Sequence, residues 1–236
     1  MNALELTGRA RTHVVEVPAL ACVLHRDAVE PFLALRRAAE RAGFDLAAAS
    51  SFRDFDRQLL LWNAKWRGER TLFDRDGRVL DASRLAPLDR IEAILAWSAL
   101  PGASRHHWGT DVDLVDRAAI PAGYRVQLVQ DEYAEAGIFG RLSRWLDAHL
   151  LRYGFFRPYR TARGGVNPEP WHASYAPVAV AAQRALTPAV MRAALEGCGL
   201  EGADVVLAHL DELHARFVAA TDRPPRMRSR WARAAR

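Results

Sequence analysis

The sequence predicts a protein that mixes helices and strands, and three observations lead to this fold class. Several stretches carry apolar residues at every third or fourth position, which is the spacing of a buried helix face. One central stretch instead alternates apolar and polar residues, as a half-buried strand does. Half of the 236 residues are hydrophobic, so we expect a globular core in one domain of ordinary size, or at most two small ones.

The first quarter of the chain contains a candidate strand and two candidate helices. The strand covers Val14–Val17. We expect Asp27 to cap a first helix that ends at Gly43, because aspartate is a favoured N-cap residue and glycine commonly follows the last turn. Asp54 likewise predicts the start of a second helix, which reaches Trp66.

A β-hairpin is predicted around the dipeptide Asp76-Gly77, because this pair is the strongest short-range hairpin signal. The dipeptide lies between two short stretches with apolar residues, 71–73 and 79–80. We expect the hairpin to lie beside the functional site as a flap. A third helix begins at Pro87, since proline is favoured at the first helical position.

The second half of the chain contains further helices and one aromatic stretch. An amphipathic helix is predicted for residues 141–153, and Gly154 ends it. The aromatic residues of 155–159 can form the wall of a pocket. Thr187 caps a short helix, and a longer helix runs from about residue 203 to residue 220.

Two short polar stretches carry the candidate chemistry. The first runs from Ser104 to Asp113, directly after a Pro-Gly pair at 101–102 that we expect to end the third helix. The second is Glu169–His172. Because side chains alternate along a strand, Asp111 and Asp113 point to the same face. An unpaired buried carboxylate is costly, so these two residues predict a functional task.

The two stretches supply the ligand types of a catalytic zinc site. Such a site uses three protein ligands and keeps a fourth position for water or substrate. His106, Asp113 and His172 form this set, and Zn²⁺ is the expected cofactor. His107 is the alternative to His106, although adjacent residues of an extended chain point apart. Glu169 lies three residues before His172, where it can act as a general base.

At these positions the sequence resembles the zinc D-alanyl-D-alanine carboxypeptidases of the VanY type, relatives of the D-Ala-D-Ala dipeptidases and of the Hedgehog-like fold. The family pattern is S-x-H-x-x-G-x-A-x-D followed by E-P-W-H, and the matching residues are Ser104, His106, Gly109, Asp113, Glu169, Trp171 and His172. A further family element, S-x-x-R with a glutamine downstream, is matched by 50–53 and Gln58. The resemblance covers about residues 44–176. It fails at Asp111, where the family has a small residue.

The resemblance implies an α+β fold in which a small, mostly antiparallel sheet carries the zinc site and helices surround it. We expect a single zinc peptidase domain in residues 1–222, with a core of about 44–176 and a C-terminal helical region of 187–220. Residues 223–236 are expected to form a basic and disordered tail.

The resemblance also implies roles for residues around the metal. Arg53 would bind the terminal carboxylate of a substrate or stabilise the transition state, because a guanidinium offers two parallel hydrogen bonds. Ser104 and Gln58 would add neutral hydrogen bonds to the same end of the substrate. Asp111 would be either a partner of a metal-binding histidine or half of a salt bridge at the end of the strand.

The charge distribution argues against a nucleic-acid partner. The formal net charge is +5, but the last fourteen residues hold six arginines and no acid, and the remaining 27 basic residues are balanced by 28 acidic ones. Cys22 and Cys198 show no disulfide or metal spacing, so we expect free thiols. No secretory signal or long apolar run is present, so we expect a cytoplasmic protein without a membrane partner.

These observations predict a zinc carboxypeptidase that hydrolyses the bond before a C-terminal D-alanine of peptidoglycan stem peptides. The alternative is an L,D-carboxypeptidase that acts on recycled tetrapeptides, because a cytoplasmic D,D-enzyme would trim the cell's own pentapeptide precursors. A metal-stabilised binding module without turnover is a third hypothesis, but it would need neither Glu169 nor Arg53. Nucleic-acid association through the basic tail is a fourth, which the neutral body does not support. The oligomeric state stays open.

Overall fold

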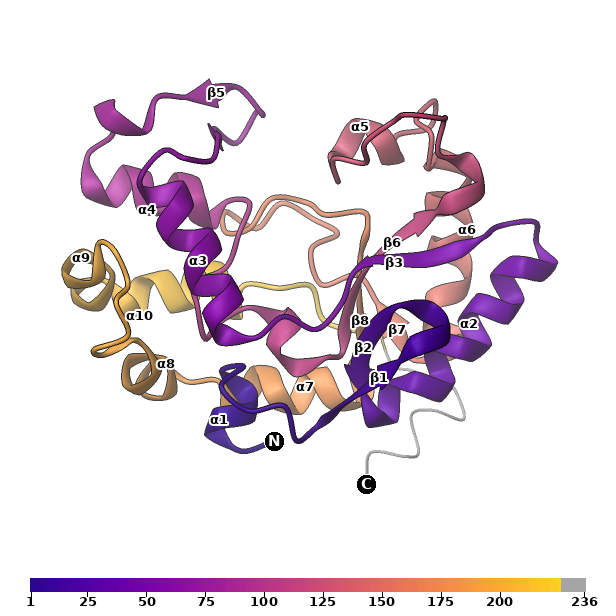
Figure 1. Ribbon diagram of the computed structural model, residues 1–236, viewed down its shortest axis with the longest axis horizontal. Coiled ribbons are helices and arrows are strands. Elements are labelled where there is room, and N and C mark those ends of the chain that lie inside the picture. Colours follow the sequence, from indigo (N-terminus) through magenta and orange to yellow (C-terminus); the bar gives the residue numbers. More distant parts are fainter. Residues whose placement is uncertain (226–236) are drawn as a thin grey trace.

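The protein is described by a computed structural model that covers residues 1–225, in which helices surround a small central sheet (Figure 1). The basic tail expected at 223–236 lies almost entirely outside the described residues. The strands are β1 (Val14–Val17), β2 (Cys22–His25), β3 (Leu46–Ser50), β4 (Leu72–Phe73), β5 (Val79–Leu80), β6 (Asp111–Asp116), β7 (Phe155–Phe156) and β8 (His172–Tyr175). All strand pairs within residues 1–225 are antiparallel, which confirms the predicted α+β fold class.

The helices flank the sheet on both sides, with α3, α4 and α8 to α10 on one side of Figure 1 and α2 and α6 on the other. The helices are α1 (Ala3–Leu6), α2 (Val29–Arg41), α3 (Phe55–Trp66), α4 (Pro87–Leu95), α5 (Gln130–Tyr133), α6 (Gly140–His149), α7 (Ala176–Ala185), α8 (Pro188–Leu195), α9 (Ala203–Ala208) and α10 (Leu210–Leu213). Among residues 1–225, each helix is too short or too polar to cross a membrane.

The central sheet has the strand order β3-β6-β8-β7, which places β6 between two partners. Its register pairs Ser50 of β3 with Asp113 and Asp113 with His172 of β8. Three residues that are far apart in the sequence therefore lie side by side across the sheet. Every residue of β6 is buried, so the polar face of this strand is enclosed as well as the apolar one.

Side chains along β6 alternate between a face that packs in the core and a face that carries the site. Val112 and Leu114 pack on one face against α2 and α6, in a cluster that includes Phe32 and Leu146. The side chains of Asp111 and Asp113 point to the opposite face, as the sequence predicted. Burial of the apolar face fixes the register, because a shift of one residue would place the two carboxylates in the core.

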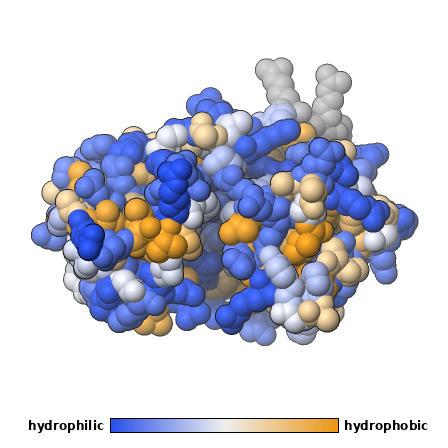
Figure 2. Space-filling view, turned by 90° about the horizontal axis from the view of Figure 1, so that it is seen from above, coloured by the Kyte–Doolittle hydropathy of each residue, from blue (hydrophilic) through white to orange (hydrophobic). Residues whose placement is uncertain are grey.

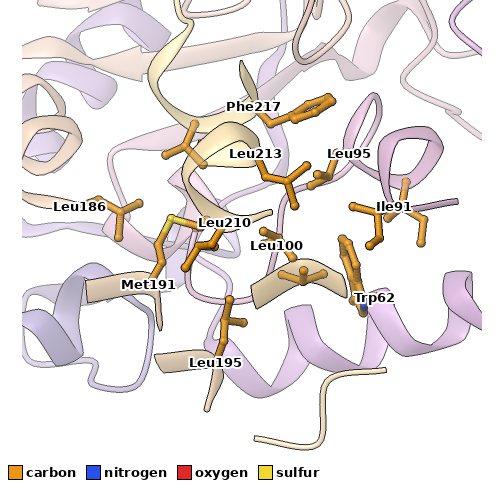
Figure 3. Close-up of a cluster of buried hydrophobic side chains, with 14 of the residues drawn as sticks. Trp62, Ile91, Leu95, Leu100, Leu186, Met191, Leu195, Leu210, Leu213 and Phe217 are labelled. Carbon is orange, nitrogen blue, oxygen red and sulfur yellow. The ribbon is translucent and has the colours of Figure 1, made fainter. Parts of the chain in front are cut away.

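A second core forms among the helices on the other side of the sheet. Trp62, Ile91, Leu100 and Leu213 are members of this cluster, and Figure 3 shows them converging from α3, α4, the following loop and α10. Trp108, one residue before the glycine of the first polar stretch, is fully buried in the same cluster. The turn that carries the site is thus held by one core and the following strand by the other.

The predicted hairpin is confirmed as β4 and β5, with Leu72 paired to Leu80. The side chain of Arg75 in its loop donates hydrogen bonds to the carbonyl groups of Gly164 and Gly165, at 2.9 Å and 2.8 Å. The hairpin therefore holds the loop that leads into Glu169.

Three predicted helix boundaries were wrong. Helix α2 begins at Val29 after a 3₁₀ turn, and Asp27 lies inside that turn, where its backbone amide donates to His25. Helix α4 ends at Leu95, before the Pro-Gly pair at 101–102, and a loop continues from there. The single helix expected for 203–220 is divided at His209 and ends in a π-helical turn from His214 to Ala219.

Candidate metal centre

The first polar stretch forms a tight turn that leads into β6. Ser104 precedes a 3₁₀ turn, Arg105–Trp108, and Gly109 ends this turn with a φ of +65°. A Cβ atom at Gly109 would lie 2.6 Å from the backbone nitrogen of His25, so only glycine fits here. The turn directs His106 toward the polar face of β6.

Three side chains meet on that face. The ligand atoms of His106, Asp113 and His172 all lie within 4.8 Å of one another, and all three residues are buried. His106 Nε2 lies 3.4 Å from Asp113 Oδ2, and His172 Nδ1 lies 3.6 Å from Asp113 Oδ1. The sequence therefore predicted a set of residues that the fold brings together.

The other nitrogen of each imidazole is engaged by the protein. His106 Nδ1 lies 2.9 Å from the carbonyl oxygen of Ser51, and His172 Nε2 lies 2.8 Å from Asp111 Oδ1. These contacts fix the orientation of both rings, as is usual for histidines that bind metals. Nε2 of His106 and Nδ1 of His172 are consequently the nitrogens that face Asp113.

The electrostatics of Asp113 fit a cation at this position. Burial raises the pKa of its carboxyl group to about 7, and the negative charge of Glu169 contributes to the rise. Its Oδ1 atom is buried and accepts no hydrogen bond within residues 1–225. Two imidazoles and one carboxylate are a donor set that zinc prefers, so the residues present fit a zinc ion.

Asp111 lies on the same face but has a cation of its own. Arg105 Nε donates a hydrogen bond of 2.8 Å to Asp111 Oδ1, and Thr110 donates its hydroxyl to Oδ2 at 2.5 Å. Burial would raise the pKa of Asp111, but the charge of Arg105 and the hydrogen bond from His172 hold it well below its ordinary value. Both alternatives that the sequence left open for Asp111 thus hold, since it orients His172 and is paired in a salt bridge.

Arg105 was not predicted from the sequence as a residue of the site. Its guanidinium is buried and also contacts the side chains of Ser174 on β8 and Gln183 on α7. A signal for this role was present, because an extra buried aspartate in the motif requires a cation nearby.

Glu169 lies beside the metal-binding face. Its Oε2 atom is 2.9 Å from His172 Nδ1, and its side chain is 12% exposed. The backbone amide of Glu169 donates to the carbonyl of Tyr159, whose ring contacts the His172 ring edge-on at 5.1 Å. The carboxylate is therefore held next to the three candidate ligands and remains accessible from outside.

Arg53 approaches the site from the loop after β3. Its guanidinium donates to Gln58 Oε1 at 2.7 Å and to Ser50 Oγ at 3.3 Å. Burial lowers the pKa of Arg53, while the charges of Asp113 and Glu169 oppose this. Asp113 and Glu169 are therefore close to the guanidinium of Arg53. An anionic group bound by Arg53 would lie beside these two carboxylates.

Gln58 has a different task from the one expected. Its side chain is fully buried, and its amide nitrogen donates to Ser98 Oγ and to the carbonyl of Ala99. No surface of Gln58 is left for a substrate to contact, so it can act only by positioning Arg53.

Ser104 and His107 belong to the interior of the turn. Ser104 is 3% exposed, and its carbonyl accepts the backbone amide of His107. His107 Nε2 accepts the amide of Gly102, and Nδ1 lies 2.6 Å from the carbonyl of Arg53. Burial lowers the pKa of His107 to about 4. The neutral ring thus holds the loop together and points away from the candidate ligands.

Seen from above, the molecular surface is hollowed between its two halves (Figure 2). In Figure 1 the β4–β5 hairpin and α5 rise on opposite sides of the same region, above β6 and β3. The hollow thus lies between the hairpin side and the α5 side of the molecule.

Comparison with known proteins points to one family. Residues 21–178 match the family model described as "VanY: D-alanyl-D-alanine carboxypeptidase". An uncharacterised protein of Haemophilus influenzae is 36% identical over 121 residues, which are 50% of this chain and 92% of that protein. Of the solved structures, VanYB in complex with D-Ala-D-Ala is 21% identical, with a TM-score of 0.49 and coverage of 78% of this chain and 88% of that one. A mutant of the vancomycin resistance D,D-pentapeptidase VanY in complex with Zn(II) is 22% identical, with a TM-score of 0.47 and coverage of 75% and 86%.

Proposed function

This chain belongs to the VanY family of D-alanyl-D-alanine carboxypeptidases and is a peptidase, and we propose that it is a zinc enzyme that removes a C-terminal D-alanine from peptidoglycan stem peptides. We further propose that residues 1–222 form one catalytic domain. The observation that carries the proposal is the buried group of His106, Asp113 and His172, with Glu169 beside it.

A zinc ion held by His106 Nε2, Asp113 and His172 Nδ1 would supply Lewis acidity, which polarises a carbonyl group and makes water easier to deprotonate. The protein prepares these three side chains for that task. Ser51 and Asp111 hold the two imidazole rings, and the sheet register holds Asp113 between them. To bind a metal, this oriented set needs His172 Nδ1 to release its hydrogen bond to Glu169, while the rings keep their places.

Glu169 is the proposed general base. Its carboxylate oxygen Oε2 takes a proton from the attacking water and returns it to the departing amine, so that the broken C–N bond leaves a neutral amino group. The position of this oxygen, 2.9 Å from His172 Nδ1, supports the assignment because both groups then reach the same reacting atoms. Glu169 is not needed as a fourth ligand.

Arg53 is the proposed partner of the substrate's C-terminal carboxylate or of the developing oxyanion. A guanidinium binds either group with directed hydrogen bonds, and its rigid placement by Gln58 and Ser50 supports this role. Ser104 stays a candidate for a substrate contact, although its side chain is almost fully buried.

The proposal is tested with purified, zinc-loaded protein and two muropeptides, a pentapeptide that ends in D-Ala-D-Ala and the corresponding tetrapeptide. Mass spectrometry should detect the loss of one alanine from the pentapeptide, and a chelator should stop the reaction. Cleavage of the tetrapeptide alone would assign L,D-carboxypeptidase activity instead. Failure to release alanine from either peptide would contradict the proposed function.

A further inference from the structure

A cavity of about 520 Å³ lies beside Arg53 and is lined by arginines. Four of them contribute to its wall, namely Arg11, Arg53, Arg57 and Arg70. Asp54 is the one acidic residue among the lining residues. We call this cavity the arginine groove. Its lining carries a formal excess of positive charge, although the body of the chain is nearly neutral.

No salt bridge within residues 1–225 engages a groove arginine, and only Arg53 among them lies near the carboxylates of the metal site. The salt bridges of residues 1–225 involve other arginines, such as Arg67, Arg105 and Arg117, and none joins a groove arginine to an acid. Asp54 is occupied as a helix cap, because its Oδ1 accepts the backbone amide of Arg57 at 2.8 Å. An excess of clustered cations over anions creates a positive potential that attracts anions.

Helix α3 carries one further basic residue near the groove, which does not line it. Gln58, Leu61 and Lys65 are spaced three and four positions apart, so they lie on one face of the helix. Gln58 on this face contacts Arg53, and Leu61 lines the groove. Lys65 is the only lysine in the chain. Burial lowers its pKa to about 8, with contributions from the positive charges of Arg70 and Arg53. It thus adds a fifth basic group to this part of the molecule.

The groove adjoins the metal-binding face through residues that belong to both or contact both. Ser50, which lines it, is paired with Asp113 across the sheet, and the carbonyl of Ser51, another lining residue, is bonded to His106. Arg53 is shared by the groove and the site. A substrate whose reacting bond lies at the metal can therefore reach Arg57 and Arg70 with its neighbouring groups.

We propose that the arginine groove binds a second carboxylate of the peptide substrate, one that lies away from the C-terminal residue, so that the enzyme selects acidic peptides. Arg53 binds the C-terminal carboxylate of the substrate, and this leaves Arg11, Arg57 and Arg70 available to bind another anionic group. This inference rests on the proposed carboxypeptidase function and specifies its substrate class. The ligand chemistry is that of a carboxylate bound by guanidinium groups through charge-assisted hydrogen bonds.

The test uses two peptides that share a C-terminal D-Ala-D-Ala and differ in one internal acidic residue, which is a carboxylate in one peptide and its amide in the other. The wild-type protein should cleave the acidic peptide with a kcat/KM about tenfold higher, which corresponds to roughly one charge-assisted hydrogen bond. The double variant Arg57→Gln/Arg70→Gln should lose this preference and retain its activity on the amide peptide.

The matched control is Arg37→Gln, which alters an exposed arginine of α2 that does not line the groove. This variant should keep the preference of the wild type. Equal cleavage of both peptides by the wild-type protein would overturn the inference. A groove variant that loses the same activity on both peptides would also overturn it, since that result indicates a general structural role.

A binding measurement separates this inference from the proposed function. The affinity of the zinc-loaded protein for fluorescent versions of both peptides is measured by anisotropy at low and at high ionic strength. Tighter binding of the acidic peptide, lost in the groove variant and weakened by salt, supports the groove even where neither peptide is cleaved. Cleavage of both peptides without any difference in binding leaves the proposed function intact and rejects the groove.

Discussion

Asp111 and Asp113 are two residues apart on the same face of β6, yet the protein treats them in opposite ways. Asp111 is paired with Arg105 and bonded by Thr110, and its pKa is held low. Asp113 lies 3.4 Å and 3.6 Å from the nitrogens of His106 and His172, one of its oxygens accepts no hydrogen bond within residues 1–225, and its pKa is raised to about 7. One carboxylate is neutralised inside the protein, and the other is left to be neutralised by an added cation.

This difference shows how a single strand can provide both a structural ion pair and a metal ligand. His172 connects the two, because its Nε2 contacts Asp111 and its Nδ1 faces Asp113. A charge on Asp111 favours a defined orientation of the ring, and that orientation directs the second nitrogen to the metal position. The Arg105–Asp111 pair thus supports the metal site without being part of it.

The largest effect is expected from Asp113→Asn. This change keeps the size of the side chain and removes the anionic ligand, so zinc content and activity should both fall to background. Folding should persist, because Asp113 Oδ1 makes no hydrogen bond to the described part of the chain that the variant would lose. Metal analysis after dialysis, together with circular dichroism, measures both quantities. Full tight binding of zinc by this variant would show that Asp111 is the ligand.

A smaller loss of activity is expected from Glu169→Gln. Glu169 contacts His172 Nδ1, the nitrogen that faces Asp113, but it is not required as a metal ligand. Turnover should fall by about 10²–10⁴, the usual contribution of a general base. Zinc content should stay normal and KM should change little if it reflects binding. Atomic absorption and steady-state kinetics test this, and a variant that no longer retains zinc would place Glu169 among the ligands.

A third change, Asp111→Asn, should affect stability more than chemistry. It leaves the buried Arg105 without its counter-charge, which typically costs about 3–5 kcal/mol of unfolding free energy. Zinc affinity should fall only by roughly 10–100-fold, since His172 loses an orienting partner and not its ligating nitrogen. Urea unfolding and zinc titration measure the two effects.

The double variant Arg105→Met/Asp111→Asn is the control for this third change. It removes both charges of the pair and should recover part of the lost stability. If Asp111→Asn alone abolished zinc binding in a folded protein, the division between the two carboxylates would be wrong.

The sequence predicted the metal residues because ligand chemistry restricts the residue types and the strand period restricts their direction. His106, Asp113 and His172 follow from these rules and from the family resemblance. The roles of Arg105 and Gln58 depend on contacts between distant segments, such as Arg105 with Gln183, and no local pattern encodes such contacts. The cavity lined by Arg11, Arg57 and Arg70 likewise forms from three separate segments.

Local rules were least reliable at helix ends, where tertiary contacts compete with capping preferences. Asp27 has the chemistry of an N-cap, but His25 accepts its amide and a 3₁₀ turn precedes α2. Val206, Leu210 and Phe217, which share the apolar spacing of residues 203–220, lie in the core. It could not reveal the break at His209, because spacing reports which side chains are buried and not whether the backbone is continuous.

The smallest expected effect is a pH dependence of the metal-free protein, and it compares the two carboxylates directly. The folded-state pKa of Asp113 is about 7, whereas its ordinary value is 3.8, so between these values the folded protein keeps a proton that the unfolded chain releases. Stability therefore falls as pH rises through this window, by at most about 1.4 kcal/mol per pH unit for one proton. Asp111 has the opposite shift, so its contribution to stability is fully present above its ordinary pKa and does not change between about pH 5 and pH 7.

Urea unfolding of chelator-treated wild-type protein and of Asp113→Asn, each at pH 5 and at pH 7, measures this difference. The variant should gain stability relative to the wild type at the higher pH. Histidines that lie away from Asp113, such as His209 and His214, contribute equally to both proteins and cancel in the difference. An unchanged difference would mean that Asp113 is already ionised without the metal, and the contrast with Asp111 would then rest on hydrogen bonding alone.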